Sequence, residues 1–182
     1  TERRYHEILQ RLERLRPVGR LLDVGCGAGH FLVVAEQRGW QGCGVEVSQS
    51  ALNALRQVQQ QRGLAFSIVE GSLAQAPFPP EHFDAMTLFE VIEHLDDPLA
   101  TLRHAYSFLK DGGILYLTTP NYDSLSRHLI GRRWRVIAEE HRCLFSAKTL
   151  RDCLVRVGFR PVGMATKNID IPEILSTWGI RK

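Results

Sequence analysis

The chain has 182 residues, of which 44% are hydrophobic, and a net charge of +3. These totals are typical of one globular domain, and they exclude a membrane-spanning protein because no apolar run approaches 18 residues. The first residues lack the apolar stretch of an export signal and the four cysteines form no CxxC pair, so we expect a cytoplasmic protein with reduced thiols.

Hydrophobic periodicity predicts helices and strands that alternate along the chain. The first element is an amphipathic helix over 3–16, which Pro17 and Gly19 end. Strands and helices of suitable length for βα units follow it. We predict strands at 20–25, 42–48, 65–71, 83–90, 113–120 and 159–167, and helices at 30–39, 49–63, 98–109 and 146–158.

This alternation predicts an α/β fold, with a mainly parallel, twisted sheet and helices on both faces. We expect a single domain over 1–182, with an N-terminal helix (1–19), a core (20–120), an irregular insert (121–145) and a C-terminal helix and strand (146–182). The insert should lie over the carboxyl edge of the sheet, where ligands bind in such folds. The chain ends soon after the sixth predicted strand, so a seventh strand is either absent or not recognisable from the sequence.

Positive charge is concentrated in one block of the chain. Residues 127–160 contain nine basic and three acidic residues, whereas residues 21–126 contain five basic and twelve acidic residues. The basic block is suited to an anionic substrate or a nucleic acid. The simpler interpretation, a solvated helix surface, is the more common one.

Three glycines separate the first predicted strand from the next helix, in "LLDVGCGAGHF". Gly25, Gly27 and Gly29 permit positive φ and close approach of a ligand to the backbone, and the helix that follows offers free N–H groups. The spacing differs from a dinucleotide fingerprint, because His30 stands where that motif needs a third small residue. The absence of GK[ST] excludes a nucleoside-triphosphate loop.

Two acids accompany these glycines at strand ends. Asp23 precedes the turn, and Glu46 closes the second strand, where a carboxylate can accept hydrogen bonds from both hydroxyls of a ribose. The alternative interpretation is a tight strand-to-helix turn without a ligand. Two acids at adjacent strand ends favour a nucleoside site over that alternative.

Four stretches in order carry a resemblance to a known family: "LLDVGCGAGHF", the strand-ending Glu46, "FDAMTLFEVIEHLDDP" and "LKDGGILYLTTPN". They are similar to the successive motifs of class I S-adenosylmethionine-dependent methyltransferases, which have a Rossmann-like fold. The most similar branch contains ubiquinone-biosynthesis O-methyltransferases and bacterial small-molecule methyltransferases. The resemblance covers about residues 20–165, and it makes 20–120 the cofactor-binding core and 121–145 a substrate lid.

The resemblance implies a site for S-adenosylmethionine, with S-adenosylhomocysteine as the product. Asp23 and the glycine turn would hold the amino-acid end of the cofactor, and Glu46 the ribose. Val47 and residues 71–73 would border the adenine, and Phe89 the methionine part. The implied cofactor-binding residues are Asp23, Gly25, Cys26, Gly27, Gly29, Glu46, Val47, Gly71, Ser72, Leu73 and Phe89.

Ser72 departs from the family pattern. The family usually has an aspartate at this position, which accepts a hydrogen bond from the adenine amino group. A serine hydroxyl also accepts, but more weakly, so the adenine contact is less well supported than the ribose contact.

The catalytic candidates are His141, His94 and Glu93. Methyl transfer is an in-line displacement, so the enzyme must align a nucleophile and remove its proton, a task suited to a histidine. His94 and Glu93 follow the fourth predicted strand in "EVIEH", and His141 lies in the predicted lid. The alternative is a solvated turn whose histidines bind backbone groups.

A metal site is a further interpretation of the same residues. Glu90, Glu93, His94 and a distant His141 are similar to the metal-ligand set of small-RNA 3′-terminal 2′-O-methyltransferases, in which a divalent ion would lower the pKa of the attacking hydroxyl. The pattern E-x-x-E-H also occurs in relatives that are not metal enzymes. We therefore predict no metal ligands.

The leading functional hypothesis is methyl transfer to an O or N nucleophile of a small-molecule acceptor. One alternative is a metal-assisted RNA 2′-O-methyltransferase, and another is a cofactor-binding module without activity. We do not expect a nucleic-acid partner, because a net charge of +6 over residues 127–160 is modest for such a surface.

Overall fold

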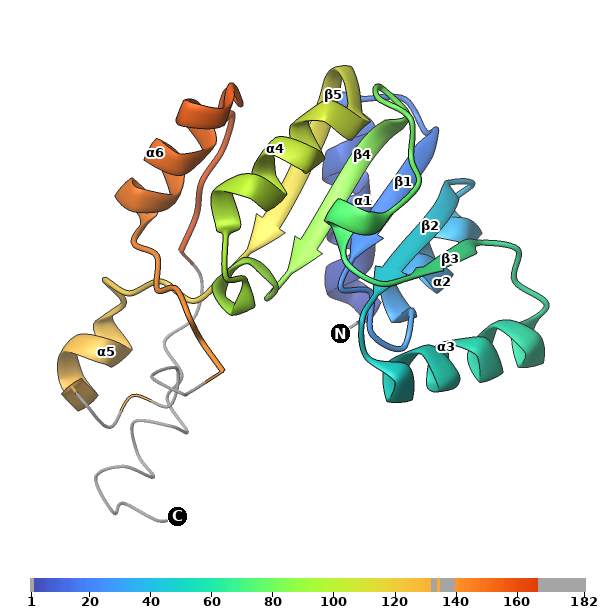
Figure 1. Cartoon of the computed structure of the whole chain (residues 1–182), viewed down its shortest axis with the longest axis horizontal. Coiled ribbons are helices and arrows are strands. Elements are labelled where there is room, and N and C mark those ends of the chain that lie inside the picture. The colour runs from blue at the N-terminus through green and yellow to red at the C-terminus, as the bar shows by residue number, and fades with distance from the viewer. Residues whose placement is uncertain (1, 132–133, 135–139, 167–182) are drawn as a thin grey trace.

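The computed structural model describes residues 2–131, 134 and 140–166. Five strands form one sheet in the order β3-β2-β1-β4-β5, and every neighbouring pair is parallel (Figure 1). The predicted α/β class is thus confirmed. The strands are β1 (Arg20–Val24), β2 (Gln41–Glu46), β3 (Ser67–Glu70), β4 (Phe83–Phe89) and β5 (Leu109–Thr118).

Helices cover both faces of the sheet, as predicted. One apolar cluster joins the sheet to α1 (Glu2–Leu15), α2 (His30–Gln37) and α3 (Gln49–Arg62). On the other face, two clusters join the sheet to α4 (Pro98–Phe108), α6 (Ala147–Val157) and the short 3-10 helices η1 (Leu73–Gln75) and η2 (Ile92–His94). Within the described ranges, no helix is both long and apolar enough to cross a membrane.

The helix boundaries follow capping chemistry that the sequence shows. Ser48 accepts a hydrogen bond from the backbone N–H of Ala51 at the start of α3, and Gly63 ends that helix in the left-handed conformation. Asp97 accepts from Ala100 N–H at the start of α4, with Pro98 in its first turn. These local signals explain why the predicted and observed helix ends agree closely.

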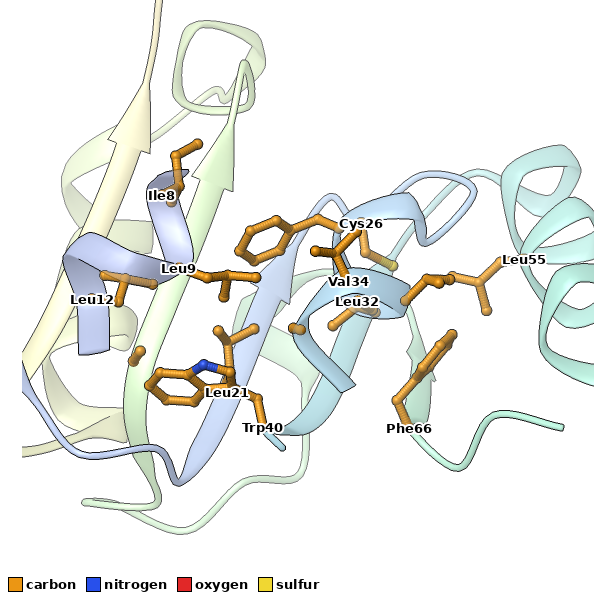
Figure 2. Packing of buried hydrophobic residues seen from close by; sticks show 14 residues of the cluster. Ile8, Leu9, Leu12, Leu21, Cys26, Leu32, Val34, Trp40, Leu55 and Phe66 are labelled. Atoms are coloured by element: carbon orange, nitrogen blue, oxygen red, sulfur yellow. The ribbon is translucent and has the colours of Figure 1, made fainter. Parts of the chain in front are cut away.

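The N-terminal helix is fixed to the body of the domain. Ile8, Leu9 and Leu12 lie on its inner face and are at most 3% exposed, in one cluster with residues of α2 and β1 (Figure 2). Arg16, just after the helix, forms an ion pair with Asp84 at 3.0 Å. Burial of several aliphatic side chains, each worth about 1.5–3 kcal/mol, holds α1 against the sheet.

The predicted sixth strand is wrong, because the described part of it, residues 159–166, forms no strand. Pro161 lacks the N–H that a strand ladder needs, and Gly163 adds flexibility without a side chain to bury. Phe159 packs against the core, but Val162 is 80% exposed and Met164 46% exposed, so these two apolar residues have no buried face to join.

β5 also begins earlier than predicted, at Leu109 instead of Gly113. The pairing with β4 jumps from Phe83↔Leu109 to Ala85↔Ile114, so the segment around Gly112 protrudes from the ladder as a bulge. Gly112, which the prediction left between a helix and a strand, therefore lies within β5.

Among its described residues, the predicted lid contains one short helix, α5 (Leu125–Ile130). The two ends of the lid meet where Asn121 forms a β-bridge with Phe145. Trp134 of the lid is buried, with 4% of its surface exposed. Two basic residues of the lid, Arg132 and Arg133, lie outside the described residues.

Candidate functional site

The glycine turn joins β1 to α2 at the carboxyl edge of the sheet. Gly25 and Gly27 have φ values of 68° and 53°, in the region that glycine favours. A Cβ at Gly25 would lie 2.6 Å from Val91 Cγ2, whereas one at Gly27 would meet none of the described atoms within 4 Å. Packing therefore requires glycine at position 25, and position 27 faces open space that a ligand can fill.

Glu46 ends β2 and holds this turn from the neighbouring strand. Its carboxylate is largely buried and accepts hydrogen bonds from the backbone N–H groups of Gly27 (2.8 Å), Val47 (2.9 Å) and Ser48 (2.8 Å). These bonds occupy three of its roughly four acceptor directions, which leaves about one for a ligand hydroxyl. Shaping the turn is a role that sequence reasoning missed for this acid.

Asp23 is buried at the end of β1, with 2% of its surface exposed. Burial raises the pKa of its carboxyl to about 7, the hydroxyl of Thr87 opposes the rise by donating a hydrogen bond of 2.7 Å, and the charge of Glu46 adds to it. Thr87 lies opposite Asp23 in the β1–β4 register. Sequence reasoning missed Thr87, because a strand register is not visible in the sequence.

A cavity of about 240 Å³ opens beside Asp23. Part of its lining comes from the predicted cofactor site, and part comes from aromatic residues outside the predicted set. The predicted residues in its lining are Asp23, Gly25, Cys26, Gly27 and Phe89. The additional aromatic residues are Tyr5 of α1 and Phe31 of α2.

The residues predicted beside the adenine lie at the ends of β2 and β3 and do not line this cavity. Val47 is 71% exposed, and Leu73 is buried in the core. Gly71 donates its N–H to the carbonyl oxygen of Glu46 (2.9 Å). The Ser72 hydroxyl donates to Gln75 Oε1 (3.0 Å) and so helps to begin η1, while its oxygen can still accept a hydrogen bond.

The three predicted catalytic residues come together beyond the end of β4. Glu93 and His94 lie on η2, and the rings of His94 and His141 are 4.7 Å apart at 69°. One ligand atom from each of the three residues lies within 4.8 Å of the others. A backbone hydrogen bond of 3.0 Å from Cys143 to the carbonyl oxygen of Glu93 ties the end of the insert to this turn.

The tautomer of His94 follows from its hydrogen bond. Its Nδ1 lies 3.0 Å from the carbonyl oxygen of Glu140. Because a carbonyl oxygen can only accept, Nδ1 of the neutral ring carries the proton, and Nε2 keeps a lone pair. That nitrogen can act as a base or a metal ligand.

Glu93 is a buried acid with an unusual environment. It is 1% exposed, and neither carboxylate oxygen has a hydrogen-bond partner among the described residues. Burial raises the pKa of the Glu93 carboxyl, and the charge of Glu90 adds to the rise. Glu90 itself is exposed, has a φ of 52°, and does not belong to the cluster of three found in the described part of the chain.

The cavity and the cluster lie on the same edge of the sheet. Phe89 lines the cavity and Glu93 follows four residues later, so their Cα atoms are at most about 14 Å apart. A family profile described as "Methyltransferase domain" matches residues 1–163, which include both features. The chain belongs to this methyltransferase family.

Curated relatives of this methyltransferase include ubiquinone biosynthesis O-methyltransferases. The enzyme of Stutzerimonas stutzeri is 31% identical over 103 residues, 56% of this chain and 44% of the relative. That of Xanthomonas campestris is 34% identical over 106 residues, 58% of this chain and 44% of the relative. The chain spans less than half the length of either relative.

Solved structures show the same fold. An S-adenosylmethionine-dependent methyltransferase of Thermotoga maritima, described as a possible histamine N-methyltransferase, is 28% identical with a TM-score of 0.66, over 86% of this chain and 72% of that one. The [4+2]-cyclase SpnF is 27% identical with a TM-score of 0.69, over 84% of this chain and 56% of that one. The chain therefore has the class I architecture of S-adenosylmethionine-dependent methyltransferases.

The residues of this methyltransferase fit that cofactor. S-adenosylmethionine has a cationic ammonium and sulfonium, a carboxylate and a ribose with two hydroxyls. The buried carboxylate of Asp23 lines the cavity without an ion-pair partner among the described residues, which suits a cationic group. The open space at Gly27 and the free acceptor direction on Glu46 suit the sugar side.

Proposed function

We propose that this methyltransferase transfers a methyl group from S-adenosylmethionine to an O or N nucleophile of a small-molecule acceptor. The observation that carries the proposal is the position of a basic imidazole nitrogen, His94 Nε2, on the same sheet edge as the cavity around Asp23. The O-methyltransferase relatives support an O nucleophile, and the Thermotoga protein described as a possible histamine N-methyltransferase supports an N nucleophile.

The proposed cofactor site follows the strand ends. When bound, S-adenosylmethionine supplies a methyl group activated by the positive charge of its sulfonium. Asp23 binds the ammonium of the amino-acid tail, and Glu46 binds a ribose hydroxyl. The further proposed binding residues are Gly25, Cys26, Gly27, Gly29, Val47, Gly71, Ser72, Leu73 and Phe89.

The proposed catalytic group consists of His94, His141 and Glu93. His94 accepts the proton of the acceptor on Nε2, while the Glu140 carbonyl holds Nδ1 and so fixes the ring. Glu93, buried next to both histidines, stabilises the positive charge that proton uptake creates. General base catalysis of this kind is typically worth 10²–10⁴ in rate.

Metal-assisted methyl transfer to an RNA 2′-hydroxyl is the second candidate function. Its supporting observation is that Glu93, His94 and His141 each place a ligand atom within 4.8 Å of the others. Two imidazoles and a carboxylate suit Mn²⁺, Fe²⁺ or Zn²⁺ better than Mg²⁺, which prefers oxygen ligands. The two candidates differ in their response to chelators.

Replacement of His94 tests the proposed base. His94→Asn keeps a donor near the position of Nδ1 but removes Nε2, whereas His94→Gln keeps a polar atom near the position of Nε2. We expect H94N to lower methyl transfer about 10²–10⁴-fold without a change in cofactor affinity. The measurement is transfer of a radiolabelled methyl group to a panel of phenols, catechols, amines and a short RNA, with calorimetry for the cofactor.

Controls in the same assay separate the alternatives. Full activity in excess EDTA would exclude the metal-assisted mechanism, and stimulation by Mn²⁺ with RNA as the acceptor would support it. Cofactor binding with no transfer to any acceptor would favour a binding module, a result compatible with the similarity to a cyclase of this fold. Unchanged transfer by H94N would contradict the assignment of His94 as the base.

A further inference from the structure

Three aromatic rings from three separate elements form one side of the cavity, which we call the aromatic wall. Its members are Tyr5 of α1, Phe31 of α2 and Phe89 at the end of β4. Their ring centroids are 5.3 Å (Tyr5–Phe31), 6.0 Å (Tyr5–Phe89) and 4.8 Å (Phe31–Phe89) apart. Each ring therefore contacts the other two, and the wall is a single packed unit.

Tyr5 is the one residue of the aromatic wall that belongs neither to the sheet nor to α2, the helix that follows β1. It lies one turn before Leu9, and Ile8, Leu9 and Leu12 anchor α1 in the core (Figure 2). The ion pair between Arg16 and Asp84 fixes the opposite end of the helix. Because core packing and this ion pair hold α1 in place, the first turn of the helix keeps Tyr5 at the cavity.

The charge of the cavity suits a cation. Asp23 contributes a buried carboxylate, and His30 is the one basic side chain in the lining that the structure describes. Burial raises the pKa of Tyr5, and the charge of Asp23 raises it further, so Tyr5 remains a neutral phenol at physiological pH. A neutral electron-rich ring attracts a cation through its quadrupole without adding a charge of its own.

We propose that Tyr5, supported by Phe31 and Phe89, makes the cofactor cavity selective for the cationic methyl donor over its neutral product. This inference rests on the proposed function, because it requires that S-adenosylmethionine occupies the cavity. Loss of the methyl group converts a sulfonium into a neutral thioether, and that change removes the attraction to the aromatic wall. Tyr5 is therefore a specificity-determining residue that favours donor binding and product release.

A purely hydrophobic role for Tyr5 predicts a different result. A ring that only excludes water would contribute equally to binding of donor and product, because the two share the nucleoside and the amino-acid tail. A role of the Tyr5 hydroxyl as a hydrogen-bonding group would be lost in Tyr5→Phe. The ratio of the dissociation constants for product and donor separates these roles.

Calorimetric titration of the whole chain with S-adenosylmethionine and with S-adenosylhomocysteine tests the proposal. We expect Tyr5→Phe to keep the ratio of the two constants and Tyr5→Leu to shift it about 2- to 30-fold against the donor. Fluorinated phenylalanines at position 5 keep the shape of the ring while weakening its quadrupole, so the ratio should shift stepwise with each added fluorine. Tyr106→Leu, on the surface of α4, is the matched control and should leave both constants unchanged.

Four outcomes would overturn the inference. Equal weakening of both ligands by Tyr5→Leu would assign Tyr5 a hydrophobic role, and a changed ratio in Tyr5→Phe would assign the effect to the hydroxyl. A flat response to fluorination would exclude the ring quadrupole. Failure of the unmodified chain to bind either nucleoside would overturn the proposed function as well, and so is distinguishable from the other results.

Discussion

Asp23 shows how a single residue links stability to ligand binding. Its carboxyl is 2% exposed and receives one hydrogen bond from Thr87, which is too little to compensate the loss of water around a charge. The result is a pKa of about 7, far above the ordinary value of 3.8. A cationic ligand would supply the missing partner. We therefore expect the free-energy cost of the buried Asp23 charge to favour binding of a cation.

The sign of this effect gives a prediction for Asp23→Asn. Between about pH 4 and pH 7 the folded chain holds a proton on Asp23 that the unfolded chain has lost, so stability from this group falls as the pH rises through that window. Asparagine removes the free-energy cost of a buried charge, and its side-chain oxygen can still accept the hydrogen bond from the Thr87 hydroxyl. We expect D23N to raise the melting temperature of the ligand-free chain by roughly 4–10 °C at pH 8, with little change at pH 4.

Calorimetry at both pH values completes this test. D23N should bind S-adenosylmethionine far more weakly than the parent chain, because the ammonium loses its carboxylate. The combination of higher stability and lower affinity is the expected signature of an acid kept for function. A lower melting temperature for D23N at pH 8 would contradict the buried-charge account.

At the scale of elements, the insert over 121–145 is separable from the cofactor cavity. The bridge between Asn121 and Phe145 brings its two ends together, so a short linker can replace the intervening residues. In the described residues, its contacts with the site run through Glu93 and His94 of η2 rather than through the cavity around Asp23. We therefore expect the insert to act on the acceptor and not on the cofactor.

Deletion of residues 124–136, with a Gly-Ser linker in their place, tests the predicted lid. We expect acceptor turnover to fall and cofactor affinity to change less than about twofold, since the cavity walls come from α1, α2, β1 and β4. Parallel measurement of transfer rate and cofactor dissociation constant provides the check. An equal loss in both quantities would contradict the lid assignment.

At the scale of the whole molecule, the cavity joins the N-terminal helix to the sheet. Tyr5 belongs to α1 and Phe89 to β4, so a nucleoside bound between them would add a further link between two segments that core packing and the Arg16–Asp84 ion pair hold together. Binding to the folded chain but not to the unfolded chain stabilises by mass action. The effect should be visible in thermal unfolding.

We expect S-adenosylhomocysteine at 100 times its dissociation constant to add about 2.7 kcal/mol and to raise the melting temperature by about 5–10 °C. Differential scanning fluorimetry measures the shift, and a metabolite screen in its presence then looks for a further rise caused by the acceptor. Nicotinamide dinucleotides are the matched negative control. An equal shift with those compounds would contradict a site specific for the methyl-donor nucleoside.

Local patterns in the sequence determined those features of this protein that depend only on residues a few positions apart in the chain. The glycine turn, the capped helices α3 and α4 and the alternation of βα units follow from spacing and capping, which act over a few residues, and the fold class follows from them. The placement of Asp23 and Glu46 at strand ends follows in the same way. These features were predicted correctly because no long-range information is needed to produce them.

Tertiary structure alone decided the features that join distant segments. It placed His141 beside His94 across 47 positions of sequence, Thr87 opposite Asp23 in the strand register, and Tyr5 in the lining of the cavity beside Asp23. It also left residues 159–166 outside the sheet, despite their apolar side chains. The physical reason is that burial and strand pairing select among many long-range arrangements with the same local pattern, so only packing of the whole chain determines which residues meet.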